Sequence, residues 1–383
     1  MISTFGDAFE VDPKVQIAKN TEVPFVEMAD IEPWNRTAHA KGRKKFSGGS
    51  KFLDGDVLVA RITPSLENGK TSIYKADQLD KNTPAGGSTE FIIVRGIPGK
   101  SISEFAYYLL RTADLRAHLI ANMNGSSGRQ RVQAGALRNY VVDLPSIEEQ
   151  QRIADMLGAL DDKIESNRRI AVKCDEVANI LFHQAATVNR KLDAVSEVRM
   201  GVSPPESSYN ETGDGIAFFQ GVRDFSLLHP VARVYTNQPK RLAAAGDILF
   251  SVRAPVGRLN IADSPCCIGR GLAAITSNRS ATCLFALRAA AAEWEKFSAE
   301  GTVFGAVNQK SLKSTLIPWP DPVAEEELEY QLSSLVTLAS HSERESISLS
   351  KLRDALLPEL MSGRMRVDEA GRLVSEALNE EIY

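Results

Sequence analysis

The chain has 383 residues, of which 43% are hydrophobic and 25% charged, a composition typical of a soluble protein of two or three globular domains. Taken as a whole, its formal net charge of −4 argues against a protein that binds nucleic acid. No run approaches the roughly eighteen apolar residues of a membrane span, and MISTFGDAFEVDP at residues 1–13 lacks the features of a signal peptide, so we expect a cytoplasmic protein without a membrane partner.

The charge is unevenly distributed along the chain. Residues 1–145 carry a net charge of +3 and residues 146–190 a net charge of −2. The same alternation follows, with +3 over residues 191–320 and −8 over residues 321–383. Two basic segments alternating with two acidic ones give a first hint about partners.

The first segment, 1–145, contains GDVLVARITPSLENGK at 55–70 and NGSSGRQRVQAGALRNYVVDLP at 124–145. The former predicts a Gly-Asp turn into a β-strand that ends at an arginine and a proline. The latter is a glycine-rich loop followed by a Leu-rich turn and a short strand. We therefore expect a mixed α/β globular domain here.

The next segment, 146–190, predicts one long helix. Pro145 blocks an earlier start, and Ser146 followed by Glu149 has the spacing of a capping box. A four-three step then runs for about four heptads with one polar residue, Asn167, in its middle. The predicted seam consists of Ile153, Leu157, Leu160, Ile164, Asn167, Ala171, Cys174, Ala178 and Leu181.

Residues 191–320 resemble residues 1–145. GDILFSVRAPVGRLN at 246–260 matches the earlier Gly-Asp motif, and EGTVFGAVNQKSLKSTLIPWP at 300–320 matches the earlier ending. In both segments a proline closes the block just before a predicted helix. The chain is thus an approximate two-fold repeat of globular block and rod.

The last segments are a second predicted helix over 321–367 and an acidic tail over 368–383. Asp321 suits an N-cap with Pro322 at the first helical position, Pro358 should kink or end the helix, and Ser362-Gly363 should stop it. The tail is helix-prone and could dock on a partner subunit or fray. The predicted seam of this helix includes Leu328, Leu332, Leu335, Ala339, Ser342, Ser346, Leu349, Arg353, Leu356 and Leu360.

A single amphipathic rod cannot bury its own apolar stripe, so each predicted helix needs a partner. The simplest assembly is an intramolecular antiparallel coiled coil of the two rods. Two alternatives are that each helix packs on a separate domain, or that the seam mediates homodimerisation.

Signatures of catalysis and of metal binding are absent from the sequence. RGIPGKS at 95–101 lacks the first glycine of a phosphate-binding loop, because that position is Val94. The histidines fall at no ligand spacing, and Cys174, Cys266, Cys267 and Cys283 form neither a zinc pattern nor a disulfide framework. We expect buried thiols, no metal and no self-contained active site.

Cationic clusters in the two basic blocks suggest duplex DNA as a partner. They are KGRKKF at 41–46, RQRV at 129–132, VRDF at 222–225, PKR at 239–241, SVRAPVGR at 251–258 and NQK at 308–310. Each cluster alone is more simply a solvated surface loop. Two such blocks on a stiff spacer would suit two separated half-sites in DNA.

The sequence resembles the specificity subunits of type I restriction–modification systems over nearly its whole length. The strongest match is LPSIEEQQRIADMLGALDDKIESNRRI at 144–170. Further matches are GDVLVARITPSLENGK, GSTEFIIVR at 87–95, GSSGRQRV at 125–132, GDILFSVRAPVGRLNIADSPCCIGRGLAAI at 246–275 and LRDALLPELMSGRMRV at 352–367. The start of the second rod, AEEELEYQLSSL, departs from the family's EEQ-type start.

This resemblance implies an α+β protein with two similar mixed α/β target-recognition domains and two helices that fix the spacing of a bipartite DNA target. It implies a non-catalytic subunit without its own cofactor, which recruits two modification subunits that bind S-adenosylmethionine and methylate adenine N6. Motor-nuclease restriction subunits would complete the complex. The implied DNA-facing residues are Lys41, Arg43, Lys44, Lys45, Arg129, Arg131, Arg223, Arg241, Arg253, Arg258 and Lys310.

Arg61 and Arg253 follow equivalent predicted strands, and each could instead pair with the aspartate of its own Gly-Asp turn. Other functions also stay open at this point: a stand-alone DNA-binding or regulatory protein of the same architecture, a coiled-coil adaptor that binds only protein, and, less favoured, an enzyme with an unrecognised site.

Overall fold

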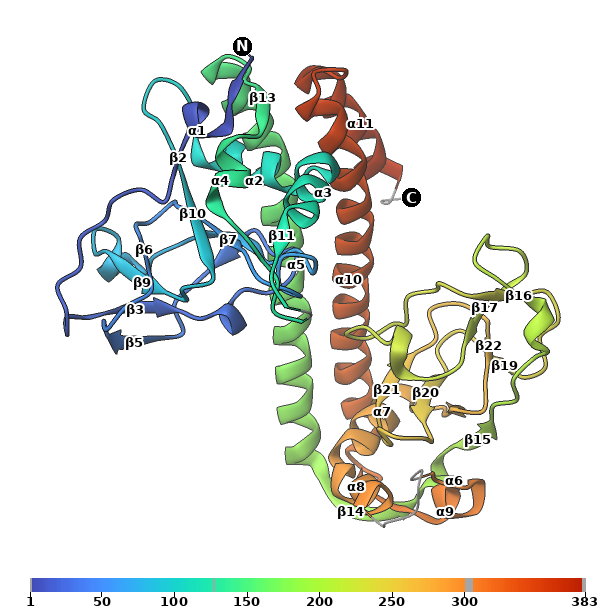
Figure 1. Ribbon diagram of the computed structural model, residues 1–383. Coiled ribbons are helices and arrows are strands. Elements are labelled where there is room, and N and C mark those ends of the chain that lie inside the picture. Colours follow the sequence, from blue (N-terminus) through green and yellow to red (C-terminus); the bar gives the residue numbers. More distant parts are fainter. Residues whose placement is uncertain (1, 127, 300–305, 381–383) are drawn as a thin grey trace. The chain divides into compact units, whose positions relative to one another are not determined.

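The computed structural model describes residues 2–126, 128–299 and 306–380. The chain forms two compact units: the first comprises Met1–Lys163 and Leu349–Tyr383, and the second Ile164–Ser348. Each unit joins a mixed α/β lobe to part of two long helices that pack together, α5 (Ile147–Ala185) and α10 (Glu325–Met361) (Figure 1). The predicted fold class is confirmed in these terms. The six residues EGTVFG at 300–305 of the second glycine-rich motif and Ser127 of the first lie outside the described residues.

The first lobe contains two main sheets, with strand orders β2-β10-β7-β8-β4 and β5-β3-β9-β6. Small two-stranded sheets, β1-β13 and β11-β12, and four helices complete it. The elements are β1 (Ile2–Thr4), α1 (Phe5–Ala8), β2 (Phe9–Val11), β3 (Glu22–Val26), β4 (Thr37–Ala38), β5 (Gly42–Lys45), β6 (Ser50–Phe52), β7 (Val57–Ala60), β8 (Thr71–Tyr74), β9 (Ala85–Gly87), β10 (Phe91–Gly96), α2 (Ser103–Arg111), α3 (Ala113–Ala121), β11 (Met123–Asn124), β12 (Arg131–Val132), α4 (Ala134–Arg138) and β13 (Val141–Asp143), with 3-10 turns η1 (Met28–Asp30) and η2 (Gln78–Asp80).

The second lobe repeats this plan with strand orders β15-β23-β20-β21 and β16-β18-β17-β22-β19, and with the pair β14-β24. Its elements are β14 (Ala186–Lys191), α6 (Leu192–Val195), β15 (Glu197–Met200), β16 (Tyr209–Asn210), β17 (Ile216–Phe219), β18 (Tyr235–Thr236), β19 (Leu242–Ala243), β20 (Ile248–Ser251), β21 (Leu259–Ile261), β22 (Cys266–Ile268), β23 (Leu272–Thr276), α7 (Ser280–Ala289), α8 (Ala291–Ala299), α9 (Gln309–Ser314) and β24 (Leu316–Pro320), with 3-10 turns η3 (Glu206–Ser208) and η4 (Val222–Asp224).

Strand register makes the two lobes comparable residue by residue. In the first lobe Val94 of β10 lies opposite Val57 of β7 and Val11 of β2. In the second lobe Ile275 of β23 lies opposite Ile248 of β20 and Val198 of β15. Each lobe also pairs two strands in parallel, β3 with β9 and β17 with β22. The similarity of the two predicted domains is therefore confirmed.

The Gly-Asp turns occupy the same place in both lobes. Gly55 and Gly246 each have a φ of +85°, a left-handed conformation that costs glycine little. The aspartate that follows each glycine is buried, and its carboxylate accepts a hydrogen bond from the backbone three residues earlier, at 2.7 Å for Asp56 and 2.8 Å for Asp247. These motifs therefore fix the entry into the central strands β7 and β20.

The long helices differ from the predicted rods at their ends. Residues 186–190, which the sequence placed in the first rod, belong instead to strand β14 (Ala186–Lys191), because they pair with β24. Residues 321–324 form a turn rather than helix, so Pro322 does not occupy a first helical position. Pro358 lies inside α10, which continues to Met361 and stops before Gly363, whose φ is +71°. Beyond it, α11 (Val367–Glu380) includes most of the predicted tail and packs Ala370 fully out of solvent.

Burial follows the four-three step on both helices. On α5 the side chains of Ile153, Leu157, Leu160, Asn167, Ala171, Cys174 and Ala178 are buried, while Ile164 and Leu181 are half-buried. On α10 Leu328, Leu332, Ala339, Ser342, Leu349, Arg353, Leu356 and Leu360 are buried, while Leu335 and Ser346 are half-buried. Asn167 Nδ2 donates to Glu345 Oε2 at 2.8 Å, so the polar seam residue has a partner on the other helix.

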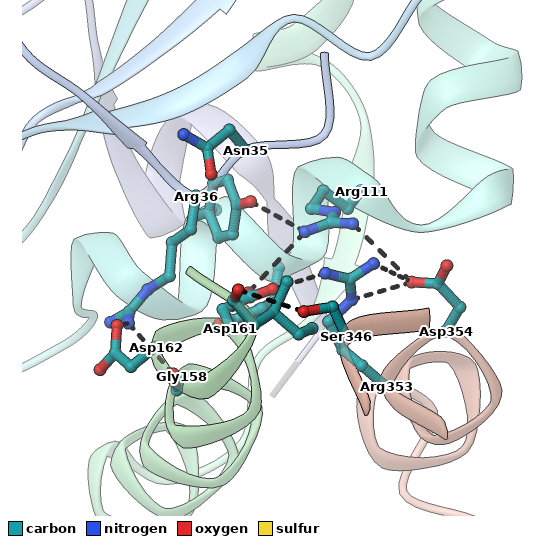
Figure 2. A network of polar contacts seen from close by, with 12 residues as sticks. Asn35, Arg36, Arg111, Gly158, Asp161, Asp162, Ser346, Arg353 and Asp354 are labelled. Atoms are coloured by element: carbon teal, nitrogen blue, oxygen red, sulfur yellow. Dashed lines mark hydrogen bonds and ion pairs between the residues drawn. The ribbon is translucent and has the colours of Figure 1, made fainter. Parts of the chain in front are cut away.

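A buried ionic network connects the two helices with the lobe in the first unit (Figure 2). Asp161 of α5 accepts hydrogen bonds from Arg353 of α10 at 2.5 Å and from the Tyr108 hydroxyl of α2 at 2.7 Å. Arg111 of α2 lies 3.8 Å from Asp161 and donates to the Tyr107 hydroxyl at 2.8 Å. Burial raises the pKa of Tyr108, with a further contribution from the Asp161 charge, so this phenol stays a donor.

We predict that Asp161→Ala lowers the free energy of unfolding by about 3–5 kcal/mol, because it removes the buried carboxylate and leaves Arg353 and Arg111 with only the exposed Asp354 as an acidic partner. Urea denaturation measures this difference. Asp155→Ala, at an exposed position of the same helix, is the matched control and should change the free energy by less than about 0.5 kcal/mol. Equal effects of the two substitutions would contradict this role of the network.

Candidate nucleic-acid interface

In the first unit, one loop of the lobe is fixed to helix α5 at Arg36. The Arg36 Nη1 donates to Asp162 Oδ1 at 2.6 Å and to the Gly158 carbonyl at 3.3 Å, and both acceptors belong to α5. Its own carbonyl accepts a hydrogen bond from Ile73 N of β8 at 2.7 Å. Arg36 therefore links β8, through its carbonyl, to α5, through its side chain.

In the second unit, the corresponding loop reaches both long helices at Leu228 and His229. Leu228 is 4% exposed and packs in a cluster with Ala171 and Cys174 of α5 and Ala339 of α10. The Glu343 carboxylate of α10 accepts hydrogen bonds from Leu228 N at 3.2 Å, from His229 N at 3.1 Å and from His229 Nδ1 at 2.8 Å.

These two loops are equivalent in the repeat. Ile73 and Ile261 lie at matching positions, opposite Val57 and Ile248 respectively. The N–H of Ile73 bonds to the Arg36 carbonyl, and the N–H of Ile261 bonds to the Leu228 carbonyl at 2.7 Å. We call residues 27–36 and 220–229 the anchor loops. Each lobe thus uses the same position to attach to the long helices, with different chemistry.

The second anchor loop forms one wall of a groove of about 1230 Å³ within the second lobe. Arg223, Gln220 and Arg270 contribute polar side chains to it, and all three are exposed. Glu206 and Glu211 also line the groove, so its surface carries both signs of charge. Such a mixed polar surface can accept and donate hydrogen bonds to a ligand with both kinds of group.

Several candidate DNA-facing residues of the first lobe are engaged by carboxylates. Arg43 binds both oxygens of Asp80 at 2.9 and 2.7 Å, and Arg131 binds Glu90 through three hydrogen bonds of 2.7–2.9 Å. Lys44 pairs with Glu27, while Lys41 lies 3.8 Å from Asp30. Lys45 and Arg129 are exposed, with no ion pair among the described residues.

The second lobe differs in this respect. The side chains of Arg223, Arg241, Arg253, Arg258 and Lys310 are exposed, and none forms an ion pair within the described part of the chain. An unpaired cation keeps its charge available to a phosphate, whereas a paired one must first give up its carboxylate. The second lobe therefore presents the more available positive charge of the two sets.

Arg61 and Arg253 do not pair with the aspartates of their own Gly-Asp turns. Arg61 donates to the Val132 carbonyl at 3.1 Å and to Gln133 Oε1 at 2.7 Å. The turn carboxylates are bound by other arginines: Asp56 by Arg95 at 2.7 Å, and Asp247 by Arg199 at 2.6 Å. The strand register also shows that Arg61 is equivalent to Val252 and not to Arg253. Arg61 follows the last paired residue of β7, and Val252 follows the last paired residue of β20.

Sequence reasoning missed Arg36, Gln220, Arg270 and Glu343. Gln220 and Arg270 carried a weak signal, since each adjoins a glycine. Glu343 carried none, because an acid in the middle of a long helix is ordinarily solvent-facing. In the described ranges we find no group of three or more His, Cys, Asp or Glu side chains able to hold a metal ion. No helix there has the length and apolarity needed to cross a membrane.

The sequence matches the family described as type I restriction modification DNA specificity domain over residues 3–173 and 187–339. The chain therefore belongs to this family: it is a specificity subunit of a type I restriction–modification system, which recognises the DNA target and is itself non-catalytic. Both lobes, most of α5 and the first part of α10 fall within the matched ranges.

Similar proteins extend over much of the chain. A putative type I restriction enzyme MjaX specificity subunit of Methanocaldococcus jannaschii is 26% identical, over 93% of this chain and 85% of that protein. The EcoEI specificity subunit of Escherichia coli is 28% identical over 41% of this chain and 27% of its own length. The crystal structure of an S subunit from M. genitalium has 14% identity and a TM-score of 0.61, covering 94% of this chain and 95% of that one, which supports the fold.

We predict that Glu343→Gln destabilises the protein at neutral pH by about 1–3 kcal/mol, since it removes the charge-assisted hydrogen bonds to the second anchor loop. Burial alone would raise the pKa of Glu343, but hydrogen bonds from His229 and the Leu228 backbone lower it below the ordinary 4.5. A carboxyl whose pKa is lower in the folded state stabilises the fold above its unfolded pKa and loses this contribution as the pH falls.

The difference between the native protein and Glu343→Gln should therefore shrink as the pH drops below about 4.5, as measured by thermal unfolding across a pH series. Glu326→Gln, at an exposed position of α10, is the control and should not alter the pH profile. A Glu343→Gln difference that stays constant with pH would refute the role of the carboxylate charge.

Proposed function

We propose that this chain recognises a two-part DNA target, with one lobe contacting each half and the α5–α10 pair joining the two readers. The observation that carries this proposal is the doubled lobe: the same sheets in the same register, each fixed to the long helices by the same anchor loop. A pair of similar readers on one stiff support suits two half-sites better than one continuous site.

The partners that we propose follow from the family. Two modification subunits would bind S-adenosylmethionine and methylate adenine N6, so this chain would need no cofactor of its own. Motor-nuclease subunits would cleave unmodified DNA, and the complex would act on double-stranded DNA in the cytoplasm. A solved structure that is 24% identical to this chain concerns the assembly and conformational transition of a type I system. The domain limits 1–145, 146–190, 191–320, 321–367 and 368–383 remain our proposed functional division.

The test of this function is co-expression with the modification subunits of the same system, followed by mapping of methylated adenines. A single target made of two defined halves separated by an undefined spacer is the expected result. Purification of this chain alone with target-specific binding and no associated modification subunit would favour the stand-alone regulator. Absence of salt-dependent duplex binding would favour the protein-binding adaptor.

We predict that Arg253→Ala and Arg258→Ala each weaken duplex binding, and that each reduces the slope of log K against log salt by about 0.9 for every phosphate that the arginine neutralises. Both arginines are exposed without an ion pair among the residues that the structure describes. Fluorescence anisotropy with a labelled duplex over a salt series measures the slope.

Arg43→Ala is the matched comparison for these two variants and should have a smaller effect, since Asp80 already binds that guanidinium. The same salt series measures all three proteins. Equal effects of the three substitutions would contradict the view that carboxylate pairing decides which cations meet the duplex.

A further inference from the structure

Each lobe has a corner where its parallel strands end, after β3 and β9 in the first lobe and after β17 and β22 in the second. The backbone hydrogen bonds at this corner are the same in both lobes, but the side chains differ. In the first lobe Ser88 N donates to the Val26 carbonyl at 3.1 Å, and in the second Gly269 N donates to the Phe219 carbonyl at 2.9 Å. The residues that follow these carbonyls, Glu27 and Gln220, are therefore equivalent.

A second pair of backbone hydrogen bonds confirms this equivalence. The Glu90 carbonyl accepts a hydrogen bond from Arg61 N, and the Gly271 carbonyl accepts one from Val252 N, both at 2.9 Å. Because Arg61 and Val252 occupy the same place after the central strand, Glu90 and Gly271 are equivalent as well.

In the first lobe this corner is occupied by ion pairs. Glu27 pairs with Lys44, and Glu90 binds the guanidinium of Arg131. The second lobe has Gln220 and Gly271 at these positions, and its corner opens into the groove described above. A shared scaffold that presents different polar groups at one corner is what two readers of different half-site sequences require.

The Gln220 side chain is held in a defined orientation. The Ser203 hydroxyl donates to Gln220 Oε1 at 3.1 Å, and the same hydroxyl accepts a hydrogen bond from Arg270 N at 3.2 Å. A Cβ atom at Gly269 would lie only 2.4 Å from Gln220 Oε1, so a larger residue there would displace the amide from this orientation. Gln220 Nε2 donates to no group in the described part of the chain. The amide thus has a donor and an acceptor lone pair to offer to a ligand.

Two exposed arginines line the same groove as this amide. Arg270 follows directly from Gly269, and Arg223 belongs to the anchor loop that Gln220 begins. Both are exposed and lack an ion pair within the described ranges, whereas the neighbouring Arg233 is bound by Asp224. The other end of the anchor loop is fixed by Glu343, so the wall that carries Arg223 is supported from α10.

We propose that Gln220 reads a base edge in the half-site contacted by the second lobe, and that Arg223 and Arg270, which line the same groove, hold neighbouring phosphates. This proposal rests on the proposed function and adds the contacting residues. An amide offers a donor and an acceptor together, the combination that pairs with N6 and N7 of adenine. A groove with both signs of charge suits base edges, because a surface made for phosphates alone would be uniformly positive.

The test uses the chain in complex with its modification subunits and a pool of duplexes randomised within the target. Gln220→Ala should reduce discrimination at one base position by about tenfold to a hundredfold while the other half-site is read as before. Gln220→Glu keeps an acceptor for Ser203 and should change the preferred base at that same position. Gln238→Ala, an exposed glutamine outside the groove, is the matched control.

Arg223→Ala and Arg270→Ala should lower affinity for all sequences alike and reduce the salt slope by about 0.9 each. Arg372→Ala, which removes the same charge from an exposed position on α11, should leave the slope unchanged. A Gln220→Ala profile identical to the native one, or discrimination that disappears from both half-sites together, would overturn the proposal. Failure of the native complex to show any two-part target would instead overturn the proposed function.

Discussion

Each long helix carries an apolar stripe that it cannot bury by itself, and the rest of the structure depends on how that stripe is covered. In both units the cover comes from the other long helix and from the attached lobe. Phe182, Leu328 and Leu332 belong to one core with Trp294 and Trp319 of the second lobe, and Leu228 packs in one cluster with Cys174 and Ala339. In the first unit, the contact that joins both helices to the lobe is ionic. Asp161 of α5 accepts hydrogen bonds from Arg353 of α10 and from Tyr108 of the lobe. Lobes and helices are therefore single packed bodies within each unit.

The repeat preserves backbone positions more strictly than it preserves chemistry. The buried aspartate of each Gly-Asp turn is bound by an arginine, but from different strands: Arg95 lies on β10 and Arg199 on β15. At the anchor position, the first lobe is attached by the ion pair of Arg36, whereas the second is attached by the apolar packing of Leu228. At the corner of the parallel strands, the first lobe has Glu27 in an ion pair, whereas the second has Gln220 exposed and bonded only to Ser203 among the described residues. Two lobes with one scaffold can in this way contact different partners or different bases while they are supported alike.

The parts of the fold that follow from local pattern were predictable from the sequence. The four-three step of the rods and the Gly-Asp turns depend on residues close together in the sequence. The structure has the helices and the turns at the positions that these motifs predict. The helix ends were less predictable, because residues 186–191 become a strand only through pairing with β24, more than a hundred residues later. The contacts of the candidate site were the hardest part of the structure to predict. Nothing local reveals that Asp80 binds Arg43, that Ser203 holds Gln220, or that Glu343 faces a loop rather than solvent.

In the function that we propose, the helix pair carries the readers and thereby determines the separation of the two half-sites. This role is tested most directly by inserting seven helix-forming residues into each helix, after Lys163 in α5 and after Ser348 in α10, and mapping the methylated target. Seven residues lengthen a helix by about 10 Å, which equals about three base pairs of duplex. We expect unchanged half-site sequences with a spacer longer by about three base pairs. An active complex with the original spacer would contradict this role of the helices.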